Sequence, residues 1–150
     1  SCEIYYVFTV QEEIGLYGAQ TSVYKIEPDW ALILDVTDAD DLSDKPTKIL
    51  GKGPCIVIKD SDMVTNRCMN NILENIAKNN RIPYQLEVTE KGVTDALQIS
   101  VSKGGIPSTI LSVPVRNIHT TVGIVSIKDI NNTIKLTELL LKKPLKVCLT

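Results

Sequence analysis

The chain has 150 residues, 43% of them hydrophobic and 23% charged, with a formal net charge of −2, and this length suits one ordinary domain with a single core. Without a basic excess, neither nucleic acid nor anionic lipid is favoured as a partner. Apolar runs such as "WALILDV" are far shorter than the roughly 20 residues of a membrane span, and no signal peptide precedes them, so we predict a cytoplasmic protein.

Strand-like and helix-like segments alternate along the first part of the chain. "EIYYVFTV" (3–10) and "DWALILDV" (29–36) are almost continuously hydrophobic and rich in β-branched and aromatic residues, as in strands covered on both faces. Between them, "GAQTSVYKI" (18–26) is long enough for a short crossover helix. A polar loop, 37–53, then precedes another apolar run, "PCIVIKD" (54–60).

The strongest helical pattern follows residue 60. Ser61 or Asp62 is predicted to cap this helix. Apolar residues at helical spacing give it one hydrophobic face: Val64, Cys68, Ile72 and Ile76. Two further strands are predicted at 83–90 and 108–115, and a closing helix at 130–143 is terminated by Pro144.

This alternation predicts an α/β fold with a mixed, mostly parallel sheet flanked by helices. The four cysteines show no CxxC spacing, which argues against a zinc ribbon. We therefore expect reduced and mostly buried thiols.

Candidate functional residues follow the predicted strands. Ligands of α/β sheets collect where strands reach their carboxyl edges, and this rule selects Glu12, Glu13, Asp35 and His119. Carboxylates with one imidazole suit a divalent metal such as zinc, cobalt or manganese. Adjacent glutamates point to different sides, so one can bind a metal while the other moves a proton.

Structural explanations for the same residues remain open at this stage. A Glu-Glu pair is commonly a solvated strand end, Asp35 can be a turn cap, and a single histidine is often a hydrogen-bonded structural residue. Other catalytic patterns are missing: the sequence has no GxSxG nucleophile elbow, and "GKGP" (51–54) lacks the frame of a phosphate-binding loop.

Several motifs in order resemble the tetrahedral metallo-aminopeptidases, the glutamyl or deblocking aminopeptidase family, some of whose members carry an endoglucanase label. These motifs are "TVQEEIGLYGA", "LDVTDADD", "GKGPCIVIKDS", "VTDA", "GGIPSTILSVPVRNIH" and "VSIKDINNTIKL". The resemblance covers nearly the whole chain. It implies a zinc-peptidase-like fold and a hydrolase that removes N-terminal residues from peptides and assembles as a homo-oligomer.

The resemblance also implies a role for each site residue. Glu12 is similar to the general base that activates the attacking water. Glu13 resembles a ligand of one of two divalent metals, zinc or cobalt, and His119 a ligand of the same metal, whereas Asp35 resembles a ligand of the other. The family's Gly-Thr-Asp-Ala-Gly pattern reads Val93 to Leu97 here, without either glycine, a departure that affects the expected substrate pocket.

The family completes its metal centre with a His-x-Asp and a bridging Asp that precede the region matched here. We therefore expect residues 1–150 to be the C-terminal portion of a catalytic domain, without the family's inserted oligomerisation domain. Alone, this portion is expected to be inactive, and it need not bind metal. Two alternatives are a catalytically silent scaffold of the same fold and a glycoside hydrolase using Glu12 or Glu13 with Asp35.

Overall fold

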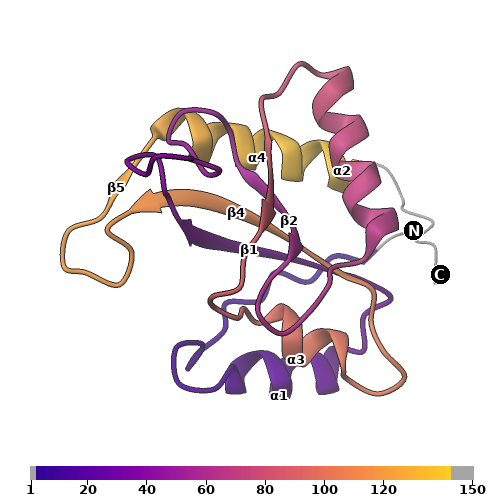
Figure 1. The fold of residues 1–150 in the computed structure, drawn as a ribbon. Coiled ribbons are helices and arrows are strands. Elements are labelled where there is room, and N and C mark those ends of the chain that lie inside the picture. The colour runs from indigo at the N-terminus through magenta and orange to yellow at the C-terminus, as the bar shows by residue number, and fades with distance from the viewer. Residues whose placement is uncertain (1–2, 143–150) are drawn as a thin grey trace.

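The computed structural model describes residues 3–142 (Figure 1). Its elements, in chain order, are α1 (Tyr17–Ile26), β1 (Ala31–Asp38), β2 (Cys55–Lys59), α2 (Arg67–Asn79), β3 (Gln85–Val88), α3 (Ala96–Ser100), β4 (Ser108–Arg116), β5 (Ile124–Val125) and α4 (Ile127–Leu141). Among these described residues, no helix is long and apolar enough to cross a membrane.

The strands form one mixed sheet in the order β1-β4-β2-β3, with β5 paired to β4. β1 runs parallel to β4 along its whole length, and β2 runs parallel to β3. The β2–β4 and β4–β5 pairings are shorter and antiparallel. The predicted α/β class with a mixed, mostly parallel sheet is confirmed, and β1 is left at one edge of the sheet.

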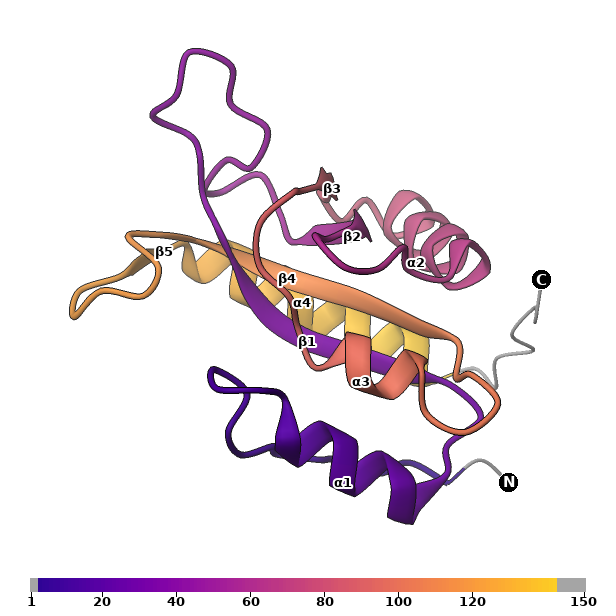
Figure 2. The same ribbon diagram turned by 60° about the horizontal axis from the view of Figure 1, so that its bottom comes forward.

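Helices cover both faces of the sheet (Figure 2). On one face, α2 and α4 pack on β2 and β4 through a core that includes Leu73, Leu136, Ile56 and Leu111. On the other face, Ile33 of β1 packs with Ala96 of α3, and α1 lies against α3. The second face is the one that bears the candidate functional residues.

The predicted start of the long central helix is wrong. Asn66, rather than Ser61 or Asp62, caps α2, because its side chain accepts a hydrogen bond from the Met69 amide at 3.0 Å. Val64 therefore precedes the helix and is exposed. The buried face of α2 is formed by Met69, Asn70, Leu73 and Ala77, and Ile72 and Ile76 pack at its margin.

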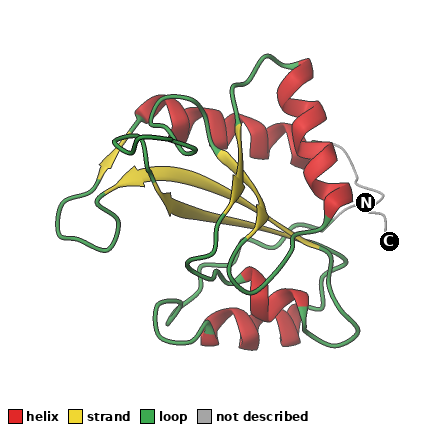
Figure 3. Ribbon diagram, in the orientation of Figure 1, coloured by secondary structure: helices red, strands yellow, loops and turns green. Residues whose placement is uncertain are grey.

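The strand predicted at residues 3–10 is not formed (Figure 3). This segment is extended but pairs with no other strand, and its apolar side chains are exposed, with Phe8 at 95%. Leu34 and Val36 on the edge strand β1 are exposed as well. The sequence pattern of a buried strand is genuine, but no strand among the described residues pairs with it.

Two glycines of the "GKGP" motif bind a buried carboxylate instead of a phosphate. Asp129, in the first turn of α4, is fully buried and accepts hydrogen bonds from the amides of Gly51 at 2.6 Å and Gly53 at 2.8 Å. Gly53 has a positive φ of 97°, and a Cβ there would lie 2.0 Å from the Pro83 carbonyl oxygen. The motif therefore fastens the loop before β2 to α4.

We expect Asp129→Ala to lower the free energy of unfolding by about 2–4 kcal/mol, because two buried amides lose a charged acceptor. Urea unfolding followed by circular dichroism measures this loss. Lys128→Ala, an exposed change in the same helical turn, is the control and should stay within about 0.5 kcal/mol of the wild type. Equal stability of the two variants would show that Asp129 does not hold this loop.

The cysteines only partly match the expectation of reduced thiols. Cys55 is free and fully buried, and burial, with smaller effects of nearby charges, raises the pKa of its thiol to about 12. Cys68 is disulfide-bonded, so the expectation is wrong there. Cys2 and Cys148 lie outside the described residues.

Candidate active site

The two adjacent glutamates lie in a tight turn that leads into α1. The turn covers residues 12–15, and the Glu12 carbonyl accepts hydrogen bonds from the amides of Gly15 and Leu16. Gly15 has a φ of 143°, a conformation that glycine adopts easily. Glu12 is half-buried, whereas Glu13 is exposed, so the two side chains have different surroundings.

Asp35 lies within β1, not beyond its end as the sequence pattern suggested. It is two residues after Ile33, so both side chains lie on the face of the sheet that α3 covers. The Val36 amide donates a hydrogen bond to Asp35 Oδ1 at 2.7 Å. Asp35 is therefore presented by a rigid strand, which is paired with β4 throughout.

His119 belongs to the loop between β4 and β5. Its backbone has a positive φ of 59°, and its side chain is 67% exposed. His119 Nδ1 lies 3.5 Å from Glu13 Oε1, so the structure brings these two predicted ligands of one metal together. Because a neutral imidazole carries no charge, this contact is an ion pair only when His119 is protonated.

Electrostatic coupling joins Glu12 and Asp35. Burial, followed by the negative charges of Asp35, Glu13 and Asp95, raises the pKa of Glu12 above its ordinary value. Burial also raises the pKa of Asp35, with further contributions from Asp95 and Glu13, although the Val36 hydrogen bond opposes the shift. His119 lowers both values. The charges of the four predicted site residues therefore influence one another.

The same coupling identifies Asp95, which was not among the predicted site residues. It immediately precedes α3 and is 8% exposed. Thr9 Oγ1 donates a hydrogen bond to Asp95 Oδ2 at 2.6 Å. Asp95 belongs to the motif "VTDA" (93–96). The following helix, α3, has only five residues, which is too short for a periodic pattern to place Asp95 near the site.

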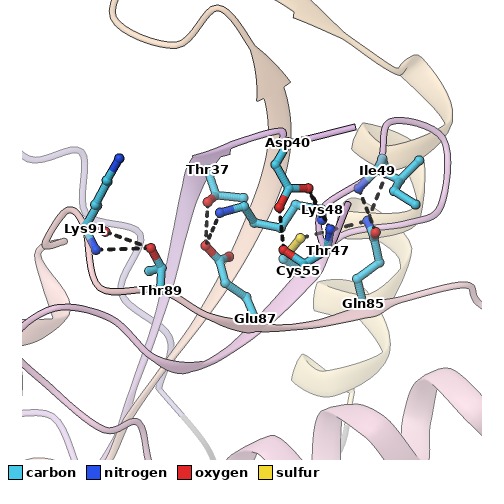
Figure 4. A network of polar contacts seen from close by, with 10 residues as sticks. All are labelled: Thr37, Asp40, Thr47, Lys48, Ile49, Cys55, Gln85, Glu87, Thr89 and Lys91. Carbon is cyan, nitrogen blue, oxygen red and sulfur yellow. Dashed lines mark hydrogen bonds and ion pairs between the residues drawn. The ribbon is translucent and has the colours of Figure 1, made fainter. Parts of the chain in front are cut away.

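A polar network fixes the loop that follows β1 (Figure 4). Asp40 accepts hydrogen bonds from Thr47 and from the Lys48 amide. Lys48 Nζ lies 3.6 Å from Glu87 Oε1, which also accepts a hydrogen bond from Thr37 Oγ1 at 2.6 Å. The loop is thereby joined to both β1 and β3.

A second contact links this loop to the strand before His119. Arg116 donates two hydrogen bonds to Asp41, from Nε at 3.2 Å and from Nη2 at 2.7 Å. Two parallel hydrogen bonds between a guanidinium and a carboxylate constrain the relative orientation of the two side chains. It fixes the end of β4 three residues before His119.

Stability should depend on pH through Glu87. Burial raises the pKa of Glu87, although Thr37 and Lys48 act in the opposite direction. A raised folded-state pKa means that stability is fully present below the ordinary value of about 4.3 and is lost as pH rises through the raised value. Since glutamine does not titrate, we expect the stability of Glu87→Gln relative to wild type to increase with pH across this window.

Urea unfolding of both proteins between about pH 4 and pH 8 measures this difference. Glu90→Gln, at an exposed position near the end of β3, is the matched control, for which we expect little change with pH. A relative stability of Glu87→Gln that is constant or falls with pH would contradict the raised pKa.

A sequence model described as M42 glutamyl aminopeptidase matches residues 1–136. The chain belongs to the M42 glutamyl aminopeptidase family. This result confirms the resemblance found in the sequence. The chain spans 41% of the length of each of two curated relatives that it matches.

Three M42-like proteins illustrate the similarity. A relative from Acetivibrio thermocellus is 46% identical over 136 residues, which are 89% of this chain and 41% of the relative. The TET aminopeptidase of Thaumarchaeota archaeon SCGC AB-539-E09 has a TM-score of 0.86 at 40% identity, over 90% of this chain and 39% of that one. The Pyrococcus horikoshii TET1 peptidase has a TM-score of 0.77 at 32% identity, over 89% and 39%.

The donors of this M42 chain fit a divalent metal by their chemistry. Carboxylates and one imidazole are hard-to-borderline ligands. The pKa values of Glu12 and Asp35 are raised first by burial and further by neighbouring negative charges, and a cation would offset the effect of those charges. Within residues 3–142, however, no three His, Cys, Asp or Glu side chains are arranged to hold a metal ion. The described residues therefore provide donors but not a finished metal centre.

Proposed function

We propose that this chain supplies the water-activating part of an aminopeptidase active site, which removes the N-terminal residue of a peptide. The observation that carries the proposal is the 3.5 Å contact between His119 Nδ1 and Glu13 Oε1, next to Glu12 in the turn, together with the electrostatic interaction of Glu12 with Asp35. A carboxyl group with a raised pKa is suited to take a proton near neutral pH. Glu12 is then the general base that removes a proton from the attacking water and returns one to the leaving amine.

The remaining predicted residues would hold metal. Glu13 and His119, whose side chains contact each other, would bind one divalent ion, and Asp35 would bind the other. Zinc and cobalt are the proposed ions because both accept mixed carboxylate and imidazole ligands. When bound, such ions make water acidic enough to deprotonate near neutral pH and polarise the scissile carbonyl.

We further propose that polypeptide outside these 150 residues completes the centre. The donors among residues 3–142 do not form a complete metal site. Exposed apolar side chains support further polypeptide on the opposite face of β1 from Asp35, because Tyr6 and Leu34 line a hollow of about 400 Å³ with Ile134 and Leu141 of α4. Contiguous apolar surface of this kind commonly marks a surface that another segment covers. The complete protein is proposed to form a homo-oligomer, as the P. horikoshii TET1 peptidase does in assembling into a tetrahedron or an octahedral shell.

The two alternatives can be distinguished from this proposal. A silent scaffold of the same fold would bind no metal and hydrolyse nothing. A glycoside hydrolase finds support only in the name endoglucanase that some similar structures carry, one of them from Thermotoga maritima, whereas the matched family is one of aminopeptidases. Chelators would not affect a hydrolase that uses two carboxyl groups alone.

A hybrid domain tests the proposal. In this hybrid, the matched part of the chain replaces the corresponding region of the Thaumarchaeota TET aminopeptidase. We expect the hybrid to release aminoacyl chromogenic groups with added zinc or cobalt and to lose this activity to a chelator, while the 150-residue chain alone shows no turnover. A folded hybrid with no activity would overturn the proposed function, and chelator-sensitive turnover by the chain alone would overturn the need for further polypeptide.

A further inference from the structure

Asp95 makes an unusual contact between two distant parts of the chain. It precedes α3, and its Oδ2 accepts the hydroxyl hydrogen bond of Thr9, 86 residues earlier in the sequence. Asp95 is more than nine-tenths buried, and Thr9 is half-buried. A short hydrogen bond from a hydroxyl to a shielded carboxylate is a strong tether between segments.

This carboxylate is costly to keep in the interior. Its second oxygen, Oδ1, is buried and has no hydrogen-bond partner among the described residues. The negative charges of Glu12 and Asp35 lie close enough to interact with it. Burial of a poorly paired polar group opposes folding. A stabilising effect on the fold therefore does not explain why an aspartate is buried at position 95.

The tether lies three residues before the general base of the proposed function. Thr9 belongs to the extended segment 3–10, which has no strand partner among the described residues. The next backbone contact is the hydrogen bond from the Gly18 amide to the Val10 carbonyl, at 3.0 Å. Both contacts hold the segment immediately before the turn that contains Glu12.

At the Asp95 end of this hydrogen bond, the following helix α3 is packed against other elements. α3 packs against β1, the strand that presents Asp35, and against α1, the helix that follows the turn. Ala96, the residue after Asp95, is fully buried in the core with Ile33. A link from α3 to Thr9 therefore fixes the Glu12 turn relative to the strand that carries Asp35.

We propose that Asp95 is a positioning residue: through Thr9 it holds the Glu12–Glu13 turn in register with Asp35. The catalytic consequence rests on the proposed aminopeptidase function, whereas the structural consequence does not. The role requires an oxygen acceptor at Asp95 and a hydroxyl at Thr9, and it does not require Asp95 to touch metal or substrate.

Hydrogen exchange on the 150-residue chain tests the tether without any activity. The amides of Gly15 and Leu16 both donate to the Glu12 carbonyl, so their exchange reports the turn. We expect Thr9→Val, which keeps the shape but removes the hydroxyl, to speed their exchange about tenfold or more, with β4 amides unchanged. Thr9→Ser should restore the wild-type rates to within about threefold. Unchanged exchange in Thr9→Val would overturn the proposal.

Kinetics of the hybrid domain separate positioning from general stabilisation. We expect Thr9→Val and Asp95→Ala to lower kcat about 10- to 100-fold, with little change in KM or bound metal, since a small misplacement of a reacting group has effects of this size. Asp95→Asn still offers an oxygen to Thr9 and should retain activity within about fivefold of wild type. If Asp95→Asn is as damaging as Asp95→Ala while Thr9→Val is harmless, charge rather than position is the role of Asp95.

The exchange and kinetic experiments also distinguish failure of this proposal from failure of the proposed function. An inactive wild-type hybrid overturns the aminopeptidase function, and the exchange of Gly15 and Leu16 still decides whether the tether holds the turn. An active hybrid in which Thr9→Val has full kcat overturns the positioning role alone.

Discussion

Glu12→Gln in the hybrid domain should lower kcat by roughly 10²- to 10⁴-fold, the usual contribution of a positioned general base. Glutamine keeps the size of the side chain and its place in the turn but cannot accept the water's proton. Because Glu12 is proposed as the base and not as a ligand, bound metal should stay at the wild-type level. Plasma mass spectrometry of the purified variant, beside steady-state kinetics, measures both quantities.

Glu3→Gln provides the control, since Glu3 is an exposed residue of the same N-terminal segment. It should leave kcat, KM and metal content close to wild type. Loss of metal from Glu12→Gln would make Glu12 a ligand instead of the base. Full activity would mean that the glutamate pair is only a solvated turn.

Most of the framework was predictable because its signals are local. β1, β2, β3, β4 and α1 lie where apolar runs and turn residues placed them, and α4 begins three residues before the predicted position 130. The predicted end of this helix at Pro144 lies outside the described residues. Errors at the start of α2 arose because several polar residues before the helix can act as caps. In the structure the cap is Asn66, because its side chain accepts a hydrogen bond from the Met69 amide.

The prediction of a strand at residues 3–10 was wrong for a different physical reason. Its hydrophobicity is that of a buried strand, but a strand exists only when its backbone groups find partners. Among residues 3–142, none pairs with it. The composition of a segment can show that it needs covering, but not whether the covering polypeptide is present.

The candidate site was predicted in part for similar reasons. Glu12, Glu13, Asp35 and His119 follow or lie in apolar strand-like runs, which signalled a common location, and their roles remain predictions. Asp95 carried no such signal, because its place depends on a single long-range hydrogen bond to Thr9 and on a helix of five residues. Contacts between distant segments have no local pattern from which they can be read.

Glu13→Ala in the hybrid domain should lower the amount of bound metal, whereas Glu12→Gln should not. If Glu13 is a ligand with His119, its removal should release one metal ion and abolish most activity at low metal concentration, because a site that loses a ligand binds its metal more weakly. Adding zinc or cobalt should then restore part of the activity by mass action. Glu12→Gln should show no such recovery, since the missing group is not a ligand.

His119→Ala is the matched test of the same site, because His119 Nδ1 lies 3.5 Å from Glu13 Oε1. If both side chains bind one ion, either variant loses the same metal, and the double variant loses no more than either alone. This non-additivity is typical of residues that act as one unit. Metal release by Glu13→Ala without release by His119→Ala would separate the two ligands, and retention of both metals by Glu13→Ala would remove Glu13 from the centre.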